Sequence, residues 1–150
     1  MEVLLKILIP ILIQIESGGD DNALGDKTCT ESYYSEELKD DICIAWEYKA
    51  VGCLQTHKVM VDDVNRIHRL RSDQSNLLKY ADRKSRNISR YMCLAYLKHY
   101  GPRRISKDNT ELENLVILGR MWNGGPQGYK KKATLPYARK ITKLYNERAK

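Results

Sequence analysis

The feature that most constrains how this chain folds is an apolar stretch near its start. In Val3–Ile15 only a lysine, a proline and a glutamine interrupt the apolar side chains. The stretch is shorter than the roughly 18 residues that a membrane span requires. Little positive charge precedes it and no Ala-x-Ala-like site follows, so it lacks the pattern of a cleavable signal peptide. A helix that is apolar on nearly every side is usually buried. We therefore predict a central helix here, bent at Pro10 and ending at Gly18 and Gly19.

The composition is that of a single folded domain. The chain has 150 residues, of which 42% are apolar and 30% are charged. This balance excludes an intrinsically disordered chain, and four cysteines are too few for a small disulfide-dense scaffold. We therefore predict one domain over residues 1–150, with a core large enough to carry a cleft.

The formal net charge of +7 is unevenly distributed along the chain. Residues 16–47 contain ten acidic and two basic residues, whereas residues 48–150 contain 23 basic and eight acidic residues. A basic region of this size favours attraction to a polyanion, either a nucleic acid or an anionic cell wall. The same charges are equally compatible with ordinary solvated faces.

Helical periodicity dominates the rest of the sequence. Apolar residues recur every three or four positions in four stretches, over residues 58–70, 87–100, 109–122 and 134–145. Asn109 or Thr110 caps the third stretch, and Thr134 caps the last. We also predict a short helix around Ser35–Ala45, a polar connection over residues 72–84 and, at most, a small β-hairpin within residues 22–56. The predicted fold class is mostly α, a helical bundle around the buried N-terminal helix.

Four short motifs follow one another along the chain. They are Glu16-Ser17-Gly18-Gly19, Gly52-Cys53-Leu54-Gln55, the helix end Ala95–Gly101 and the turn Asn123–Gly128. Together they resemble motifs of the lysozyme superfamily, in particular soluble lytic transglycosylases, and residues 133–141 resemble the end of invertebrate-type lysozymes. The resemblance implies an α+β lysozyme-like catalytic domain without a cofactor, similar to small phage or bacterial members. Members of the family have only a few residues between the positions of Asp26 and Ala50, so residues 28–48 are interpreted as an insertion.

The resemblance implies that Glu16 is the general acid and base of glycosidic bond cleavage. This chemistry needs a carboxyl group that keeps its proton, and desolvation against an apolar helix raises the pKa of a carboxyl group. Glu16 directly follows the apolar stretch, so its position suits that role. For the second acid we favour Asp26, while Asp20 and Asp21 compete with it and otherwise serve as turn residues. Lytic transglycosylases use one glutamate, so hydrolysis and transglycosylation both stay open.

Other residues of these motifs are candidates for binding a saccharide. Gln55 is the counterpart of a family glutamine that bonds sugar amide or hydroxyl groups, or else it satisfies its own loop. The glycines after Asn123 bring backbone close to a substrate or simply end a helix. Tyr129 offers an aromatic face in a glycine-rich loop, whereas Trp122 is expected in the core. The predicted substrate-binding residues are Ser17, Gln55, Asn123, Gly124, Gly125 and Tyr129.

The cysteines and histidines form neither a metal motif nor a nucleophile motif. Cys29 and Cys43 lie in the insertion and are able to cross-link it, while Cys53 and Cys93 are either buried thiols or a second pair. No C-x-x-C spacing occurs and the histidines are scattered, so we predict no metal site.

The leading hypothesis is a muramidase that cleaves the β-1,4 bond between N-acetylmuramic acid and N-acetylglucosamine. Its partners are then the peptidoglycan polysaccharide and the anionic cell envelope, without a membrane span. It acts on the bacterial cell wall, in the periplasm, outside the cell or as part of a virion. The alternative is a non-catalytic basic helical module that binds nucleic acid through Lys130–Lys132 and Arg83–Arg90. That alternative gives no reason for the Glu16 and Asn123 motifs, so nucleic acid is not the expected partner.

Overall fold

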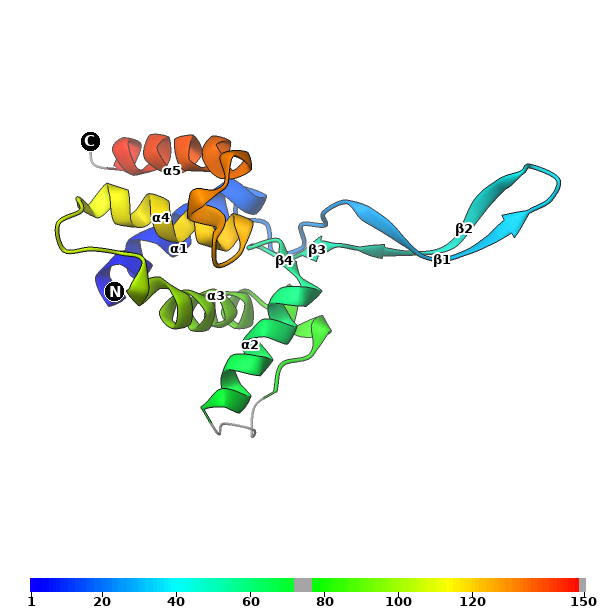
Figure 1. The fold of residues 1–150 in the computed structure, drawn as a ribbon, viewed down its shortest axis with the longest axis horizontal. Coiled ribbons are helices and arrows are strands. Elements are labelled where there is room, and N and C mark those ends of the chain that lie inside the picture. Colours follow the sequence, from blue (N-terminus) through cyan, green and yellow to red (C-terminus); the bar gives the residue numbers. More distant parts are fainter. Residues whose placement is uncertain (72–76, 149–150) are drawn as a thin grey trace.

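The computed structural model describes residues 1–71 and 77–148, and this part of the chain is mostly helical (Figure 1). Its α-helices are α1 (Glu2–Ser17), α2 (Lys58–Leu70), α3 (Arg86–Tyr100), α4 (Glu111–Gly124) and α5 (Leu135–Arg148). Short 3-10 helices connect them: η1 (Tyr80–Lys84), η2 (Gly101–Arg103), η3 (Gly128–Lys130) and η4 (Lys132–Thr134). The four helices predicted after residue 57 are confirmed, with ends that differ by up to three residues. Residues 72–76 of the predicted polar connection lie outside the described residues.

Helix α1 is central to the body, as the apolar stretch predicts. It contacts α3, α4 and α5, and most of its apolar side chains are buried. The helix is continuous through Pro10, whose ring lies on the exposed face. It ends at Gly18, which adopts the left-handed conformation with φ 63° and donates its N–H to the carbonyl of Gln14. A residue without a side chain takes this conformation at little cost.

The hydrophobic core forms where α1 packs against its neighbours. Its largest fully buried side chains come mainly from α1, α3 and α4, and each contributes roughly 1.5–3 kcal/mol by leaving water. They include Leu5, Leu8, Ile11, Leu12, Met92, Tyr96, Leu97, Leu115, Leu118 and Met121. The predicted helical bundle around a buried N-terminal helix is therefore confirmed.

A side-chain cap defines where α4 begins. Thr110 Oγ1 accepts a hydrogen bond from the Glu113 N–H, and the Glu113 carboxylate accepts one from the Thr110 N–H at 2.7 Å. This capping box settles the choice between Asn109 and Thr110 at the start of α4. Thr134 does not cap α5 in this way, because its hydroxyl donates to the Gly128 carbonyl and accepts from Arg120.

A long β-hairpin, here called the arm, projects from the helical body (Figure 1). It consists of β1 (Lys27–Ser35) and β2 (Asp40–Tyr48), paired antiparallel from Lys27 opposite Tyr48 to Ser35 opposite Asp40. A disulfide joins Cys29 to Cys43, with Cα atoms 5.8 Å apart. The arm contains residues 28–48, the segment interpreted from the sequence as an insertion. The prediction of a helix around Ser35–Ala45 was wrong, because this segment forms the turn and most of β2.

The base of the arm continues into a small antiparallel sheet beside the helices. Its strands are β3 (Ala50–Val51) and β4 (Thr56–His57), and Leu24 bridges to Val51. The Gly25 N–H donates to the Ala50 carbonyl at 2.8 Å, and the Lys49 N–H donates to the Asp26 carbonyl at 2.9 Å. A hairpin within residues 22–56 is thus confirmed, although it is much longer than the sequence suggested.

Replacing both Cys29 and Cys43 with serine is expected to loosen the arm and leave the body folded. A hairpin without a third strand is marginally stable in water. A cross-link spanning 14 residues of sequence contributes roughly 3 kcal/mol by the chain-entropy argument. Hydrogen exchange of the arm amides should therefore accelerate by about two orders of magnitude, while exchange in α1 stays slow. Equal loss of protection in α1 would contradict an arm that is independent of the core.

Candidate active site

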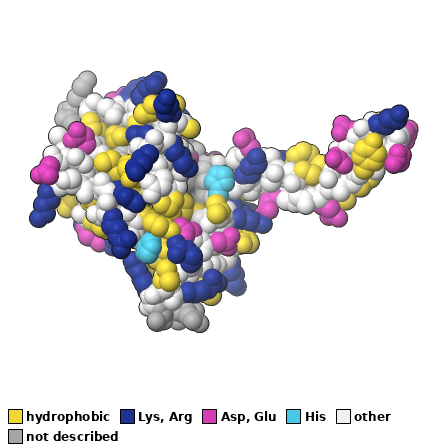
Figure 2. Space-filling model, viewed as in Figure 1, with side chains coloured by type: hydrophobic (Ala, Val, Ile, Leu, Met, Phe, Trp, Pro, Cys, Tyr) yellow, Lys and Arg dark blue, Asp and Glu magenta, His cyan; other side chains and the backbone are white. Residues whose placement is uncertain are grey.

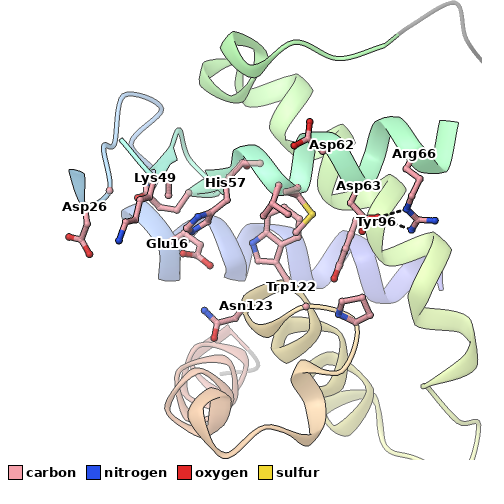
Figure 3. Close-up of a pocket in the computed structure, with 18 residues that line it drawn as sticks. Glu16, Asp26, Lys49, His57, Asp62, Asp63, Arg66, Tyr96, Trp122 and Asn123 are labelled. Carbon is pink, nitrogen blue, oxygen red and sulfur yellow. Dashed lines mark hydrogen bonds and ion pairs between the residues drawn. The ribbon is translucent and has the colours of Figure 1, made fainter. Parts of the chain in front are cut away.

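A cleft of about 880 Å³ lies where the end of α1 meets the small sheet and helices α2, α3 and α4. It brings together residues that are far apart in the sequence. Five of the predicted site residues line it: Glu16, Asp26, Gln55, Asn123 and Gly125. Figure 3 shows the Glu16 and Asn123 side chains, from α1 and the end of α4, beside the same space, whereas Asp26 at the base of the arm lies off to one side. This volume lies within the range that is typical of ligand-binding clefts.

Glu16 lies in the last turn of α1 and faces the cleft (Figure 3). The hydroxyl of Tyr137, on α5, donates a hydrogen bond to Glu16 Oε1 at 2.6 Å. Burial raises the pKa of Glu16 above its usual value, although the Tyr137 hydrogen bond and the Lys140 charge act in the opposite direction. A raised pKa lets a carboxyl group keep its proton to a higher pH than a free one does, which suits the role of general acid.

Replacing Tyr137 with phenylalanine is expected to raise the pKa of Glu16 further. The substitution keeps the buried ring but removes the hydroxyl that stabilises the charged carboxylate. A carbon-13 NMR titration of the glutamate carboxyl groups measures this directly. Tyr145→Phe is the matched control, because Tyr145 donates in the same way to the exposed Glu111 at 2.7 Å. An unchanged or lower pKa of Glu16 in Tyr137→Phe would contradict the role given to this hydrogen bond.

The Gly52–Gln55 motif forms a tight turn that places Gln55 in the cleft. The Gln55 N–H donates to the Gly52 carbonyl at 3.0 Å, and Gln55 itself has a φ of 44°. Its amide Nε2 donates to the carbonyls of Ala23 and Gly52, both at 3.1 Å. These bonds satisfy the loop and orient the side chain. They leave Oε1 as the atom available to accept a hydrogen bond from a ligand.

The end of α4 forms the opposite wall of the cleft. Helix α4 ends at Gly124, and Gly125 follows with a φ of 84°. Asn123 is exposed on the last turn, and its amide points toward the space below Glu16 (Figure 3). Trp122 is both part of the core, as predicted, and part of the lining. This wall therefore presents to the cleft the amide of Asn123, the backbone at Gly125 and part of the Trp122 indole.

Only one of the three candidate second acids lines the cleft. Asp20 accepts the Asn22 N–H at 2.8 Å, as expected of a turn residue. Asp21 lies 2.7 Å from Arg86 Nε and fixes the start of α3 to the loop. Asp26 lines the cleft, is exposed, and has its carboxylate turned away from Glu16 (Figure 3).

Three predicted binding residues lie outside the lining of the cleft. The Ser17 hydroxyl donates to the Cys53 carbonyl at 2.9 Å and accepts the Gly19 N–H, so it joins α1 to the Gln55 turn. The Gly124 carbonyl accepts a hydrogen bond from Lys131. The Tyr129 ring is covered by Arg104 and Lys130, each 5.5 Å from its centroid. These residues support the walls rather than face a ligand.

Several lining residues were not among the site residues predicted from the sequence. Thr56 and Tyr96 are each 1% exposed, and within the described chain Thr56 Oγ1 and the Tyr96 hydroxyl have no hydrogen-bond partner. Unpartnered buried polar atoms are rare in folded proteins, so these two are candidates to bond a ligand. Asp63 also lines the cleft and accepts hydrogen bonds from Arg66 and Tyr100. Helical periodicity identifies Tyr137 only as a position on an apolar stripe, and the sequence marks Tyr96 only as part of the Ala95–Gly101 motif.

The remaining cysteines are not arranged as nucleophiles. Cys53 and Cys93 are free and buried, and burial raises the pKa of both thiols. A raised pKa lowers the fraction of reactive thiolate at neutral pH. Among residues 1–71 and 77–148, no three His, Cys, Asp or Glu side chains are grouped so that they could hold a metal ion. No helix in the same ranges has both the length and the apolar character to cross a bilayer.

Comparison with known proteins adds no relative. No protein-family model, curated protein or solved structure matches this chain. The interpretation of the cleft therefore depends on its own residues and on the motifs that they form.

Proposed function

We propose that this chain is a muramidase with a lysozyme-like catalytic domain, which cleaves the β-1,4 bond between N-acetylmuramic acid and N-acetylglucosamine in peptidoglycan. The observation that supports this most strongly is the partly buried Glu16 carboxyl group in the cleft, with its pKa raised by desolvation. Gln55 and Asn123, which belong to separate motifs, line the same cleft. If each motif resembled the family only by chance, there would be no reason for Glu16, Gln55 and Asn123 to line one cleft.

In the proposed reaction Glu16 donates its proton to the glycosidic oxygen as the bond to the anomeric carbon breaks. The resulting carboxylate then accepts a proton from the attacking nucleophile. If the nucleophile is water, the product has a reducing end. If it is the 6-hydroxyl of the same muramic acid, the product has a 1,6-anhydro end. The position of Asp26, turned away from Glu16 in Figure 3, favours the route that needs only one carboxylate.

The other lining residues have roles in holding the saccharide. Gln55 Oε1 accepts an N–H from an N-acetyl group, and the Asn123 amide bonds a hydroxyl or a carbonyl group. The buried hydroxyls of Thr56 and Tyr96, which have no hydrogen-bond partner within the described chain, form hydrogen bonds to the sugar. The Trp122 indole provides an apolar contact for a pyranose ring. No metal or organic cofactor has a step in this mechanism.

The charge and the disulfide are consistent with action at the cell wall. The surplus of basic residues in residues 48–150 attracts the chain to an anionic envelope, an effect that salt weakens. The Cys29–Cys43 disulfide is typical of oxidising compartments such as the periplasm or the extracellular space. We propose the bacterial cell wall as the place of action.

Mass spectrometry of digested muropeptides tests both the activity and its chemical class. The protein is incubated with purified peptidoglycan, and the soluble fragments are separated and weighed. Anhydro ends are lighter than reducing ends by one water, so the two routes give distinct masses. Fragments of either kind support the proposal. Release of no fragments by the folded protein, from walls that a known muramidase digests, overturns it.

The contacts of the basic residues favour this proposal over a nucleic-acid-binding module. Arg83 is buried and donates to the carbonyls of Tyr80 and Thr56. Arg86 pairs with Asp21, and Lys131 donates to the Gly124 carbonyl. These are three of the seven basic residues in the two stretches, and their engagement within the protein leaves fewer charges to bind phosphates. A mobility-shift assay with duplex and single-stranded DNA, next to the wall digest, distinguishes the two functions.

A further inference from the structure

The arm exposes large apolar side chains that contribute nothing to the core. Five of them are more than half exposed: Tyr33 (53%), Tyr34 (54%), Leu38 (65%), Ile44 (56%) and Trp46 (59%). Isolated exposed apolar residues are common, but a cluster on one projecting element marks an interaction site. Tyrosine and tryptophan are also the side chains most enriched at protein–protein interfaces.

The arm has the opposite charge to the rest of the molecule. Residues 27–48 contain six acidic and two basic residues, whereas the rest of the chain contains 24 basic and 13 acidic residues. Four of the acidic residues flank the turn at the tip, namely Glu36, Glu37, Asp40 and Asp41. Figure 2 shows acidic side chains around apolar ones on the arm, and many basic side chains on the body. An anionic polymer would therefore be repelled from the tip, and a basic surface would be attracted.

A hollow on the outer face of α5 has the complementary character. It measures about 400 Å³ and is lined by Leu135, Ala138, Arg139, Thr142 and Lys143. These positions are spaced by three or four residues and therefore form one stripe along the helix. The stripe lies apart from Tyr137 and Ile141, which face the core. Leu135 and Ala138 form the apolar part of the hollow, called its apolar floor here, and Arg139 and Lys143 lie beside them on the same helix. Lys143 also lies 3.9 Å from Glu147.

We propose that the tip of the arm of one copy docks into the α5 hollow of a second copy. Leu38 and Tyr34 meet the apolar floor, while the acidic residues of the tip face Arg139 and Lys143. The arm projects away from the body that carries its own α5 (Figure 1), so the contact forms between copies. The two surfaces differ, which makes the contact heterologous and allows closed rings or open chains. This inference does not depend on the chemistry of the cleft.

Charge reversal on each surface, alone and in mixture, tests the pairing. One variant carries Glu36→Lys with Glu37→Lys, and the other carries Arg139→Glu with Lys143→Glu. Association of each, measured by sedimentation velocity over a concentration series, should weaken about tenfold or more relative to the wild type. Mixing the two variants should restore association, because each altered surface then meets an oppositely charged one. Leu38→Ala, which keeps all charges, should also weaken association.

A matched control separates this contact from a general effect of charge. Arg103→Glu with Lys107→Glu makes the same change in net charge on exposed residues outside the hollow, and it should associate like the wild type. Circular dichroism confirms that every variant is folded. A wild type that sediments as a monomer up to its solubility limit overturns the proposal and leaves the arm for another protein. Failure of the mixture to associate, or equal weakening in the control, also overturns it.

Discussion

Replacing Glu16 with glutamine is expected to lower the rate of peptidoglycan cleavage by roughly 10²–10⁴-fold, the usual contribution of a general acid. Glutamine has nearly the same shape and its carbonyl still accepts the hydrogen bond from Tyr137. It has no proton to donate to the glycosidic oxygen, and it cannot accept one afterwards. The rate of release of soluble fragments from purified walls measures the loss.

The structure supplies a matched control for this substitution. Glu111 on α4 also accepts a hydrogen bond from a tyrosine of α5, Tyr145, but it is exposed and lies outside the cleft. Glu111→Gln removes the same charge and should keep wild-type activity. If Glu16→Gln cleaves walls as fast as Glu111→Gln does, Glu16 is not the general acid.

The same substitution has a predictable effect on stability. Because the pKa of Glu16 is raised in the folded state, the folded chain binds this proton more tightly than the unfolded chain does. The free energy of unfolding of the wild type therefore falls as pH rises from the usual glutamate pKa through the raised one. Glu16→Gln lacks this loss, so it should gain stability relative to the wild type as pH rises and show no such gain at low pH. Urea denaturation at several pH values tests the sign.

The sequence predicts the helical body well because burial leaves a local pattern. Ten buried side chains that α1 and α4 present to the core recur at helical spacing, and Gly18 and Thr110 mark helix ends that the structure reproduces. The position of Glu16 follows from the same pattern, since it directly succeeds the buried stretch. Where the spacing of apolar residues matches the face that packs in the core, the sequence alone predicts the helix and its ends.

Neither the arm nor the contact of Tyr137 with Glu16 leaves a local pattern in the sequence, and the physical reasons differ. No face of the arm packs against the core, so burial does not impose a clear alternation of apolar and polar residues. Ile42, Ile44 and Trp46 do alternate with other residues. The acidic residues around them, however, make the sequence of this segment look like that of a solvent-exposed helix. Tyr137 meets Glu16 across 121 residues of sequence, and only the packing of α5 against α1 brings them together.

Replacing Gly52 with alanine is expected to destabilise the fold by about 3 kcal/mol or more, at the upper end of single substitutions. Gly52 has a φ of 81°, and a Cβ added there would lie 2.1 Å from the carbonyl oxygen of Arg83. That carbonyl cannot withdraw easily, because it accepts a hydrogen bond from the buried Ser89 at 2.7 Å. The Arg83 side chain, in turn, is held by the carbonyls of Tyr80 and Thr56.

Gly18→Ala is a control that separates the cost of the steric clash at Gly52 from the cost of a positive φ. Gly18 also has a positive φ, 63°, but a Cβ there would meet no atom within 4 Å. Its cost should be only the roughly 1–2 kcal/mol of a left-handed conformation. The difference in the free energy of unfolding between the two variants, from urea denaturation, then measures the close approach of the Gln55 turn to η1. Equal costs would mean that the turn moves aside, and Gln55 would then not be held in the cleft by this contact.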